Sequence, residues 1–204
     1  TPGKTFEEIR VDEYQSYSSS GAKNVCMTVW VLNSRGVAVR ARANTRINKM
    51  NLRKCKVRLI LALEKVVHAE YDRLLRTYVY STRHPLIADM VFINVLIDQE
   101  RRFDTYIRCL KSLNTDYESD SKAFRHMTRA RSLIELFSNP DLIRQVFVES
   151  ESMSKNDPFL MQQKAIFELH CPGGSLSQAE RLLSRASELP PYSSSIKHSL
   201  AETQ

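Results

Sequence analysis

The sequence predicts a mainly α-helical protein in which a small helical domain with one β-hairpin precedes an array of paired helices. Hydrophobic residues make up 42% of the 204 residues, which is enough to build cores, whereas five glycines and seven prolines are too few for a β-sandwich or barrel. Only the neighbouring runs 65–71 and 75–80 have the β-branched and aromatic content of strands. Elsewhere apolar residues mostly recur at helical spacing.

The first part of the chain is predicted to hold three helices after an irregular lead-in over residues 1–22. A mostly buried helix is expected over 24–34, and a shorter one with a weaker pattern over 39–47. The third helix is expected over 51–63, where apolar and basic residues separate onto different faces. Its apolar stripe consists of Leu52, Cys55, Leu59, Ile60 and Leu63.

A β-hairpin is predicted next, because the strand-like runs 65–71 and 75–80 are separated by the polar pair Asp72-Arg73. Tyr78 and Tyr80 share one face of the second strand. Three helices followed by a hairpin is the element order of a winged helix-turn-helix. We therefore expect residues 23–83 to form a winged-helix-like domain and residues 84–204 to form a helical repeat domain.

All elements after residue 83 are predicted to be helices, and capping residues mark where most of them begin. A proline in the first turn favours helices that open at His84-Pro85, Asn139-Pro140 and Asp157-Pro158. Apolar spacing alone indicates a helix over 103–110. Asp120 is expected to cap one long helix that continues to Phe137.

The segment 157–191 resembles one tetratricopeptide-type helix hairpin. Ser175 and Gln178 form a capping box for its second helix, which is expected to stop at Pro190-Pro191. Met161 stands where tryptophan is usual. The expected small and core positions are Ala165, Ala179, Leu183 and Ala186. Because one repeat cannot bury its own face, we expect the preceding helices to stack on it, or further copies after Gln204.

Positive charge is concentrated in the first half of the chain, which has a net charge of +7 overall. Residues 1–112 hold 20 Lys and Arg against 11 Asp and Glu, whereas residues 113–204 hold 10 against 12. No acidic residue lies between Glu13 and Glu64. This pattern indicates a phosphate-binding face for nucleic acid or a nucleotide, or else a solvated face that pairs with acidic groups elsewhere. Aromatic residues are scarce there, which argues against single-strand binding by base stacking.

No arrangement of residues predicts an enzyme, a metal site or a bound cofactor in this chain. The histidines and the four cysteines are scattered, without C-x-x-C or helical His pairs. Because the scattered cysteines predict no disulfide framework, a reducing, cytoplasmic location is expected. The apolar run 90–97 is far shorter than a bilayer-spanning segment, so no transmembrane segment is expected. Because the chain begins with Thr1, we expect either a removed leader or a piece of a longer protein.

Arg83 and His84 are the strongest local candidate for a binding site, because they directly follow the predicted hairpin. They place a guanidinium and an imidazole at a helix N-terminus, where anions bind readily. This predicts a phosphate or nucleotide contact. The alternative is that His84 only precedes a helix opened by proline.

Several segments together resemble the winged-helix and C-terminal helical region of bacterial STAND-type P-loop NTPases. They are Tyr80-Ser81-Thr82-Arg83-His84-Pro85-Leu86-Ile87-Ala88-Asp89-Met90-Val91-Phe92, Asn114-Thr115-Asp116-Tyr117, Arg129-Ala130-Arg131, 157–163 and 179–183. The resemblance extends over roughly residues 6–200. It implies an effector domain and an ATP-binding NTPase core before this region, a histidine in the winged helix that touches a nucleotide phosphate, and helical repeats that sense a trigger, often in antiviral defence. The chain has neither Walker motif, so we expect no hydrolysis by this part alone.

The expected function is regulation and partner recognition within a STAND-like NTPase. Its expected partners are the NTPase and effector domains of the parent chain and a protein trigger, with a homo-oligomer as a further option. A rival interpretation is a free-standing winged-helix DNA binder with 51–63 as recognition helix. Its groove contacts would be Arg53, Lys54, Lys56 and Arg58. A third interpretation is a solenoid scaffold, in which the basic stretch between Glu13 and Glu64 binds no ligand.

Overall fold

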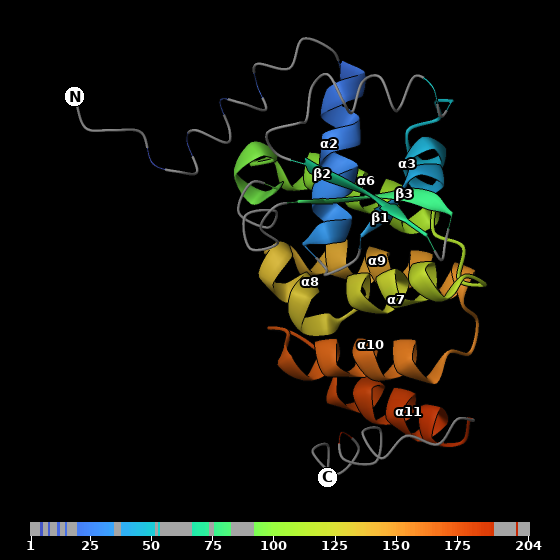
Figure 1. Ribbon diagram of the computed structural model, residues 1–204. Coiled ribbons are helices and arrows are strands. Elements are labelled where there is room, and N and C mark those ends of the chain that lie inside the picture. Colours follow the sequence, from blue (N-terminus) through green and yellow to red (C-terminus); the bar gives the residue numbers. More distant parts are fainter. Residues whose placement is uncertain are drawn as a thin grey trace. The chain divides into compact units, whose positions relative to one another are not determined.

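The computed structural model describes residues 5, 8, 12, 15, 20–34, 38–51, 53, 67–73, 76–82, 92–189 and 199. The chain divides into two compact units, unit 1 over residues 1–114 and unit 2 over residues 115–204 (Figure 1). Most described residues are helical, with one small antiparallel sheet, as the sequence predicts. Within the described ranges, no helix combines the length and the apolar character needed to cross a membrane.

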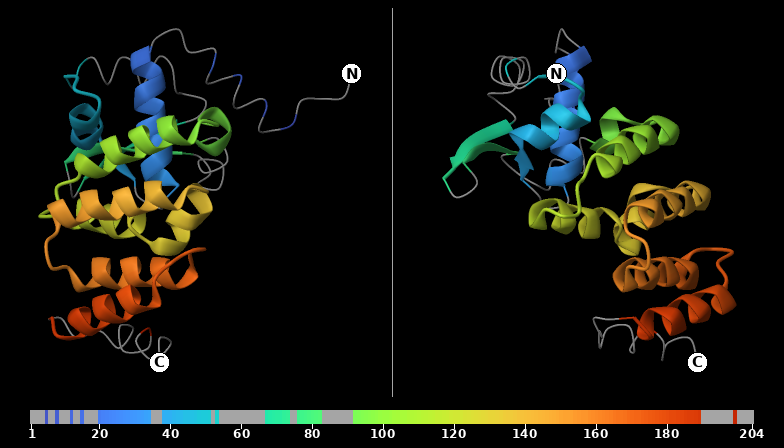
Figure 2. Two further views of the ribbon diagram at one scale, coloured as in Figure 1. Left: turned by 180° about the vertical axis from the view of Figure 1, so that it is seen from behind. Right: turned by 90° about the vertical axis from the view of Figure 1, so that its right-hand side faces the viewer.

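Unit 1 combines helices with a three-stranded antiparallel sheet whose strand order is β1-β3-β2. Strands β2 and β3 form the predicted hairpin, which pairs Val67 with Thr82 at its base and Asp72 with Thr77 at its tip. The views in Figures 1 and 2 place the hairpin and α6 on opposite sides of α2. The elements are α2 (Ser20–Asn33), β1 (Val39–Arg40), α3 (Ala41–Ile47), β2 (Val67–Asp72), β3 (Thr77–Thr82) and α6 (Gln99–Lys111).

Residues 39–47 are not one helix, contrary to the prediction. Val39 and Arg40 form the short strand β1, paired with Tyr80 and Val79 of β3, and α3 begins only at Ala41. Arg40 has an extended backbone (φ −66°, ψ 145°) and is the N-cap residue of α3. Hydrogen bonding to a strand distant in sequence therefore overrides the local helical pattern. The helix predicted over 51–63 falls almost entirely outside the described residues.

Helix α2 is the centre of unit 1. Nearly every side chain from Val25 to Leu32 is buried, because this helix is apolar on all sides. It contacts α3, α6 and the sheet. At its last residue, Asn33 Oδ1 accepts hydrogen bonds from both the backbone N–H and the hydroxyl of Thr82, each 2.9 Å long. The helix is thereby joined directly to the end of β3.

Helix α6 belongs to unit 1, because its buried face packs against α2. Asp98 caps it by accepting a hydrogen bond from the N–H of Glu100. The side chain of Arg102 turns back to the preceding segment and donates to the carbonyl oxygens of Leu96 and Ile93. The domain boundary expected at residues 83 and 84 stays a prediction, since residues 83–91 lie outside the described part of the chain.

Every regular secondary-structure element among the described residues of unit 2 is a helix. Its helices are α7 (Glu118–Met127), α8 (Ala130–Leu136), α9 (Pro140–Met153), α10 (Pro158–His170) and α11 (Leu176–Ser187). The predicted starts at Asn139, Asp157 and Ser175 are confirmed, because each side chain accepts a hydrogen bond from a backbone N–H in the first turn. These local signals can be read without knowing the tertiary structure.

The prediction of a single long helix from Asp120 to Phe137 is wrong, because two helices, α7 and α8, occupy this range. Helix α7 begins at Glu118, so Asp120 is a buried residue of its first turn and not its cap. The helix ends after Met127: the hydroxyl of Thr128 bonds to the carbonyl oxygen of Phe124, and Arg129 is extended. Gln163 of α10 then accepts the N–H of Ala130 at 3.1 Å, which supplies a partner for a backbone group freed by the break.

Helices α10 and α11 lie side by side in both figures and are joined by residues 171–175. Their contact is built from fully buried residues: Ala165, Ala179, Leu183 and Ala186. Three of the four are alanines, so the two backbones can approach closely. These are the small and core positions expected from the sequence. Glu168, also buried, accepts hydrogen bonds from the N–H of Ser175 and from Arg144 of α9, and so links three helices.

Candidate anion-binding surface

The charge of the chain is divided between the two units. Unit 1 contains 20 Lys and Arg against 11 Asp and Glu, and unit 2 contains 10 against 12. Unit 1 is therefore the part of the molecule that attracts anions. The described cations of unit 1 lie on several elements, α6 among them, and one set of them lies on α3, on the turn after it and at the tip of the hairpin.

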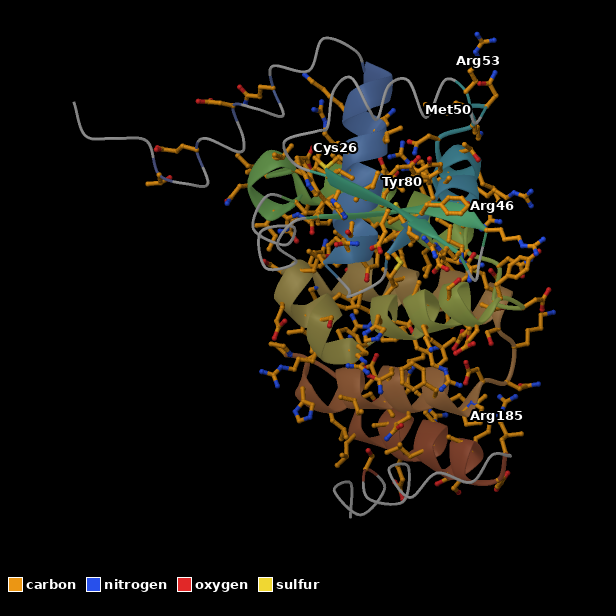
Figure 3. The ribbon with its side chains drawn as sticks, viewed as in Figure 1. Cys26, Arg46, Met50, Arg53, Tyr80 and Arg185 are labelled. Carbon is orange, nitrogen blue, oxygen red and sulfur yellow. The ribbon has the colours of Figure 1, made fainter. Side chains whose placement is uncertain are left out.

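Most of the sequence-predicted site residues lie outside the described residues. This holds for Arg83 and His84, the expected phosphate contact, and for Lys54, Lys56 and Arg58 of the expected recognition helix. Arg53 is described, and its side chain is exposed. In Figure 3, Arg53 and Arg46 both extend into solvent on the α3 side of unit 1. The contacts expected among the other residues stay predictions.

Helix α3 and the turn after it present a short series of cations. Arg42, Arg46 and Lys49 are exposed, and each lies on the face of α3 or its C-terminal turn that is turned away from buried Ala43 and Ile47. Arg46 is held in place, because its Nε donates to the carbonyl oxygen of Ser112 at 2.9 Å. Lys49 has φ +49°, the left-handed conformation common just after a helix.

The tip of the hairpin carries two arginines next to an exposed aromatic pair. Tyr71 and Tyr78 are directly opposite each other in the strand register, and their rings meet edge to face at 5.3 Å. They are 51% and 40% exposed. Arg73 and Arg76 are exposed at the start and end of the turn, and neither forms an ion pair with any described residue.

The hairpin extends beyond the core of unit 1. On a single face of the hairpin, Val67, Tyr80 and Thr82 are buried at the base, whereas Tyr71 and Tyr78 are exposed near the tip. The right-hand view of Figure 2 shows the hairpin projecting from α2 on the side away from α6. Its tip can therefore meet a partner without any rearrangement of the core.

A largely buried polar cluster of unit 1, formed by Thr28, Asn44, Asn48 and Cys109, contains no reactive nucleophile at neutral pH. Burial raises the pKa of the Cys109 thiol to about 12, and the charge of Arg108 and a hydrogen bond with Thr28 only partly oppose that rise. The amide of Asn48 donates to Thr28 Oγ1 and to Asn44 Oδ1, at 3.1 and 2.6 Å. A neutral, buried thiol is a poor nucleophile, so this cluster serves packing.

Metal ligation finds no support in the described part of the chain, where no three His, Cys, Asp or Glu residues converge. The three described cysteines are free thiols. What the described residues offer is therefore a set of exposed cations and one aromatic pair on unit 1.

The hairpin tip is the feature that sequence reasoning misses. The strand alternation groups Tyr78 with Tyr80 on one face, but Tyr80 is buried and Tyr78 is exposed beside Tyr71. The signal that could find this pair is the distance from the turn, because positions 71 and 78 flank it symmetrically. Comparison with known proteins adds nothing to this picture, since no family model, curated protein or solved structure matches the chain.

Proposed function

We propose that the chain is the regulatory region of a STAND-like NTPase, with a winged-helix unit 1 and a tetratricopeptide-like unit 2. The observation that carries the proposal for unit 1 is strand β1. It lies between α2 and α3 and pairs with β3 of the hairpin, so the chain order is helix, strand, helix and hairpin. A winged helix has the same short strand after its first helix, closing a three-stranded sheet.

The proposal for unit 2 is supported by the pair α10 and α11. Its contact is made by residues at the spacing expected of a tetratricopeptide repeat, with Ala165 facing Ala179, Leu183 and Ala186. Stacked helix pairs of this kind offer extended surfaces to protein partners. In this proposal unit 2 recognises a protein trigger, consistent with a sensor role in antiviral defence.

In this proposal unit 1 acts on the nucleotide-binding part of the longer protein. Its excess of cations favours docking against phosphate groups, and Arg83 and His84 contact the phosphate of ATP held by the NTPase core. Unit 2, with a net charge of −2, takes no part in that contact. The region itself carries no catalytic group, binds no cofactor alone and works in the cytoplasm as part of the larger chain or its oligomer.

The reading frame before Thr1 and the nucleotide affinity of the longer protein test this proposal. The frame should encode a P-loop, and Arg83→Ala combined with His84→Ala should weaken ATP binding at least about tenfold, because a charge-assisted contact contributes roughly 1.5–3 kcal/mol. Arg131→Ala, an exposed arginine of α8, is the matched control and should leave the affinity unchanged. A frame without a P-loop rejects the proposal. Unchanged ATP affinity in the double variant rejects the phosphate contact.

The hairpin tip favours a second candidate function, binding of duplex DNA. Arg73 and Arg76 flank the turn beside an exposed tyrosine pair, on the same unit as Arg53 and the expected recognition helix. A projecting hairpin with two arginines is suited to the phosphate backbone beside a groove.

Mobility-shift titrations of the 204-residue chain with a short duplex test this second function. Binding should fall steeply between about 50 and about 200 mM salt. Arg73→Gln with Arg76→Gln should weaken it and reduce the salt slope by about 1 for each of the two arginines that binds a phosphate. Arg181→Gln on α11 should do neither. Absence of binding at low salt removes the DNA-binding function.

A further inference from the structure

A pocket of about 440 Å³ opens within unit 2, beside the turn that connects α9 to α10. Lys155 and Asn156 come from that turn, Leu160 and Met161 from the first turns of α10, and Arg185 from the last turn of α11. In Figure 3, Arg185 lies at the end of α11 where the α9–α10 connection passes. Its volume lies in the range of ligand sites, and its lining is mostly polar, with Leu160 and Met161 as the apolar residues.

The two carboxylates of the pocket wall already have partners. Glu151 forms an ion pair with Lys164, with 2.7 Å between Oε1 and Nζ. Asp157 is the N-cap of α10: one carboxylate oxygen accepts the N–H of Phe159 at 2.9 Å, and the other accepts the hydroxyl of Ser154. The charge of Glu151 is therefore paired within unit 2, whereas Asp157 keeps its negative charge and has hydrogen bonds from neutral donors.

The two cations of the pocket are not neutralised in the same way. Arg185 donates through one terminal nitrogen to Asn156 Oδ1 at 2.8 Å, which is a neutral partner. Neither Arg185 nor Lys155 forms an ion pair with any described residue. Asn156 adopts φ +59°, a left-handed conformation that asparagine tolerates, and this turn brings its amide to the guanidinium. Arg185 is therefore oriented while most of its N–H donors stay available.

We propose that this pocket binds an acidic side chain of a partner peptide, flanked by an apolar residue. The carboxylate would meet the guanidinium of Arg185, whose planar fork matches it, and Lys155 would add a second positive charge. The neighbouring apolar side chain would rest mainly on the half-buried Met161, because Leu160 is only 2% exposed. A nucleic acid is the poorer occupant, because unit 2 as a whole carries a net negative charge. The inference rests on the proposed role of unit 2 in protein recognition and names the partner's chemistry.

NMR titration of the isotope-labelled 204-residue chain tests the site. The probe is an acetylated, amidated pentapeptide, Gly-Leu-Glu-Leu-Gly, and its control has glutamine in place of glutamate. The acidic peptide should bind with a Kd of roughly 1 mM or tighter and shift the Arg185 Nε–H, the Asn156 side-chain amide and the Lys155 backbone signal. The glutamine peptide should bind at least about tenfold more weakly.

Two arginine variants of α11 distinguish binding in the pocket from nonspecific attraction by positive charge. Arg185→Gln should weaken the acidic peptide about tenfold, whereas Arg181→Gln, an exposed arginine of α11 outside the pocket, should not. Equal binding of both peptides, unchanged affinity in Arg185→Gln, or no shift at these residues overturns the proposal. Stronger binding of an acetylated peptide that has no acidic side chain but a free C-terminal carboxylate overturns the assignment to a side chain. The ATP measurement on Arg83 and His84 is independent, so its failure would leave these outcomes unchanged.

Discussion

Asn33 is the residue that couples the helical core of unit 1 to its sheet. Its Oδ1 accepts both donors of Thr82, and both residues are buried. Asn33→Ala leaves two buried donors without this acceptor, so we expect the free energy of unfolding to fall by roughly 1–3 kcal/mol. Thr82→Val, which removes only the hydroxyl, should cost less because the N–H still bonds to Asn33. Urea unfolding of both variants measures this, and equal losses would contradict it.

Cys109 makes the stability of unit 1 depend on alkaline pH. Burial raises its folded-state pKa from 9.0 to about 12. Below about pH 8 the thiol is protonated in both states and has no effect on the pH dependence. Above that pH the unfolded chain loses the proton while the folded chain keeps it, so unfolding becomes more favourable as the pH rises.

The matched comparison is with Cys109→Ala, which lacks this titration. Between about pH 10 and about pH 11 the wild type should lose up to about 1.4 kcal/mol per pH unit relative to the variant. Denaturant unfolding at several pH values measures the difference. Parallel pH profiles would show that the thiol is more accessible to solvent than the structure indicates.

At the residue scale the sequence predicts local contacts but not distant ones. Asn139, Asp157 and Ser175 are identifiable as caps because each bonds to an N–H only two or three residues away. The hydrogen bond between Asn33 and Thr82 joins residues 49 positions apart, and no local sequence pattern near either residue predicts it.

Among elements, those with a long apolar pattern are predictable from the sequence and those made by tertiary pairing are not. Helix α2 and the hairpin carry their own signals over many residues. Strand β1 has two residues, too few for any periodicity, and forms because β3 offers it an edge. The break between α7 and α8 contains neither glycine nor proline. A partner for the N–H of Ala130 comes from Gln163, which lies on a later helix.

The close approach of α10 and α11 requires small residues at their contact. Ala165 and Ala179 are fully buried there, so a larger side chain must push the helices apart. We expect Ala179→Leu to lower the stability of unit 2 by about 1–3 kcal/mol. Ser184→Leu, on the exposed face of the same helix, should change it by no more than about 0.5 kcal/mol. Thermal unfolding followed by circular dichroism compares them, and similar effects would refute the packing argument.

At the scale of the whole molecule, the two units differ both in net charge and in the composition of their cores. Unit 1 combines the cationic excess with a core around α2, and unit 2 combines a slight negative charge with helix pairs. A polyanionic partner should therefore stabilise unit 1 more than unit 2. The chain contains a built-in reporter for this, because its single tryptophan, Trp30, is buried in α2.

Heparin serves as a model polyanion for testing this division. At low salt and a heparin concentration about a hundredfold above its Kd, the unfolding transition reported by Trp30 fluorescence should gain about 2.7 kcal/mol, because binding to the folded state adds that much. The circular dichroism transition, to which unit 2 contributes five helices within the described residues, should shift less and become biphasic. Raising the salt should abolish the difference, since the attraction is electrostatic, and neutral dextran should have no effect. A coincident shift of both transitions would instead mean that the polyanion binds both units, or that they unfold as one cooperative structure.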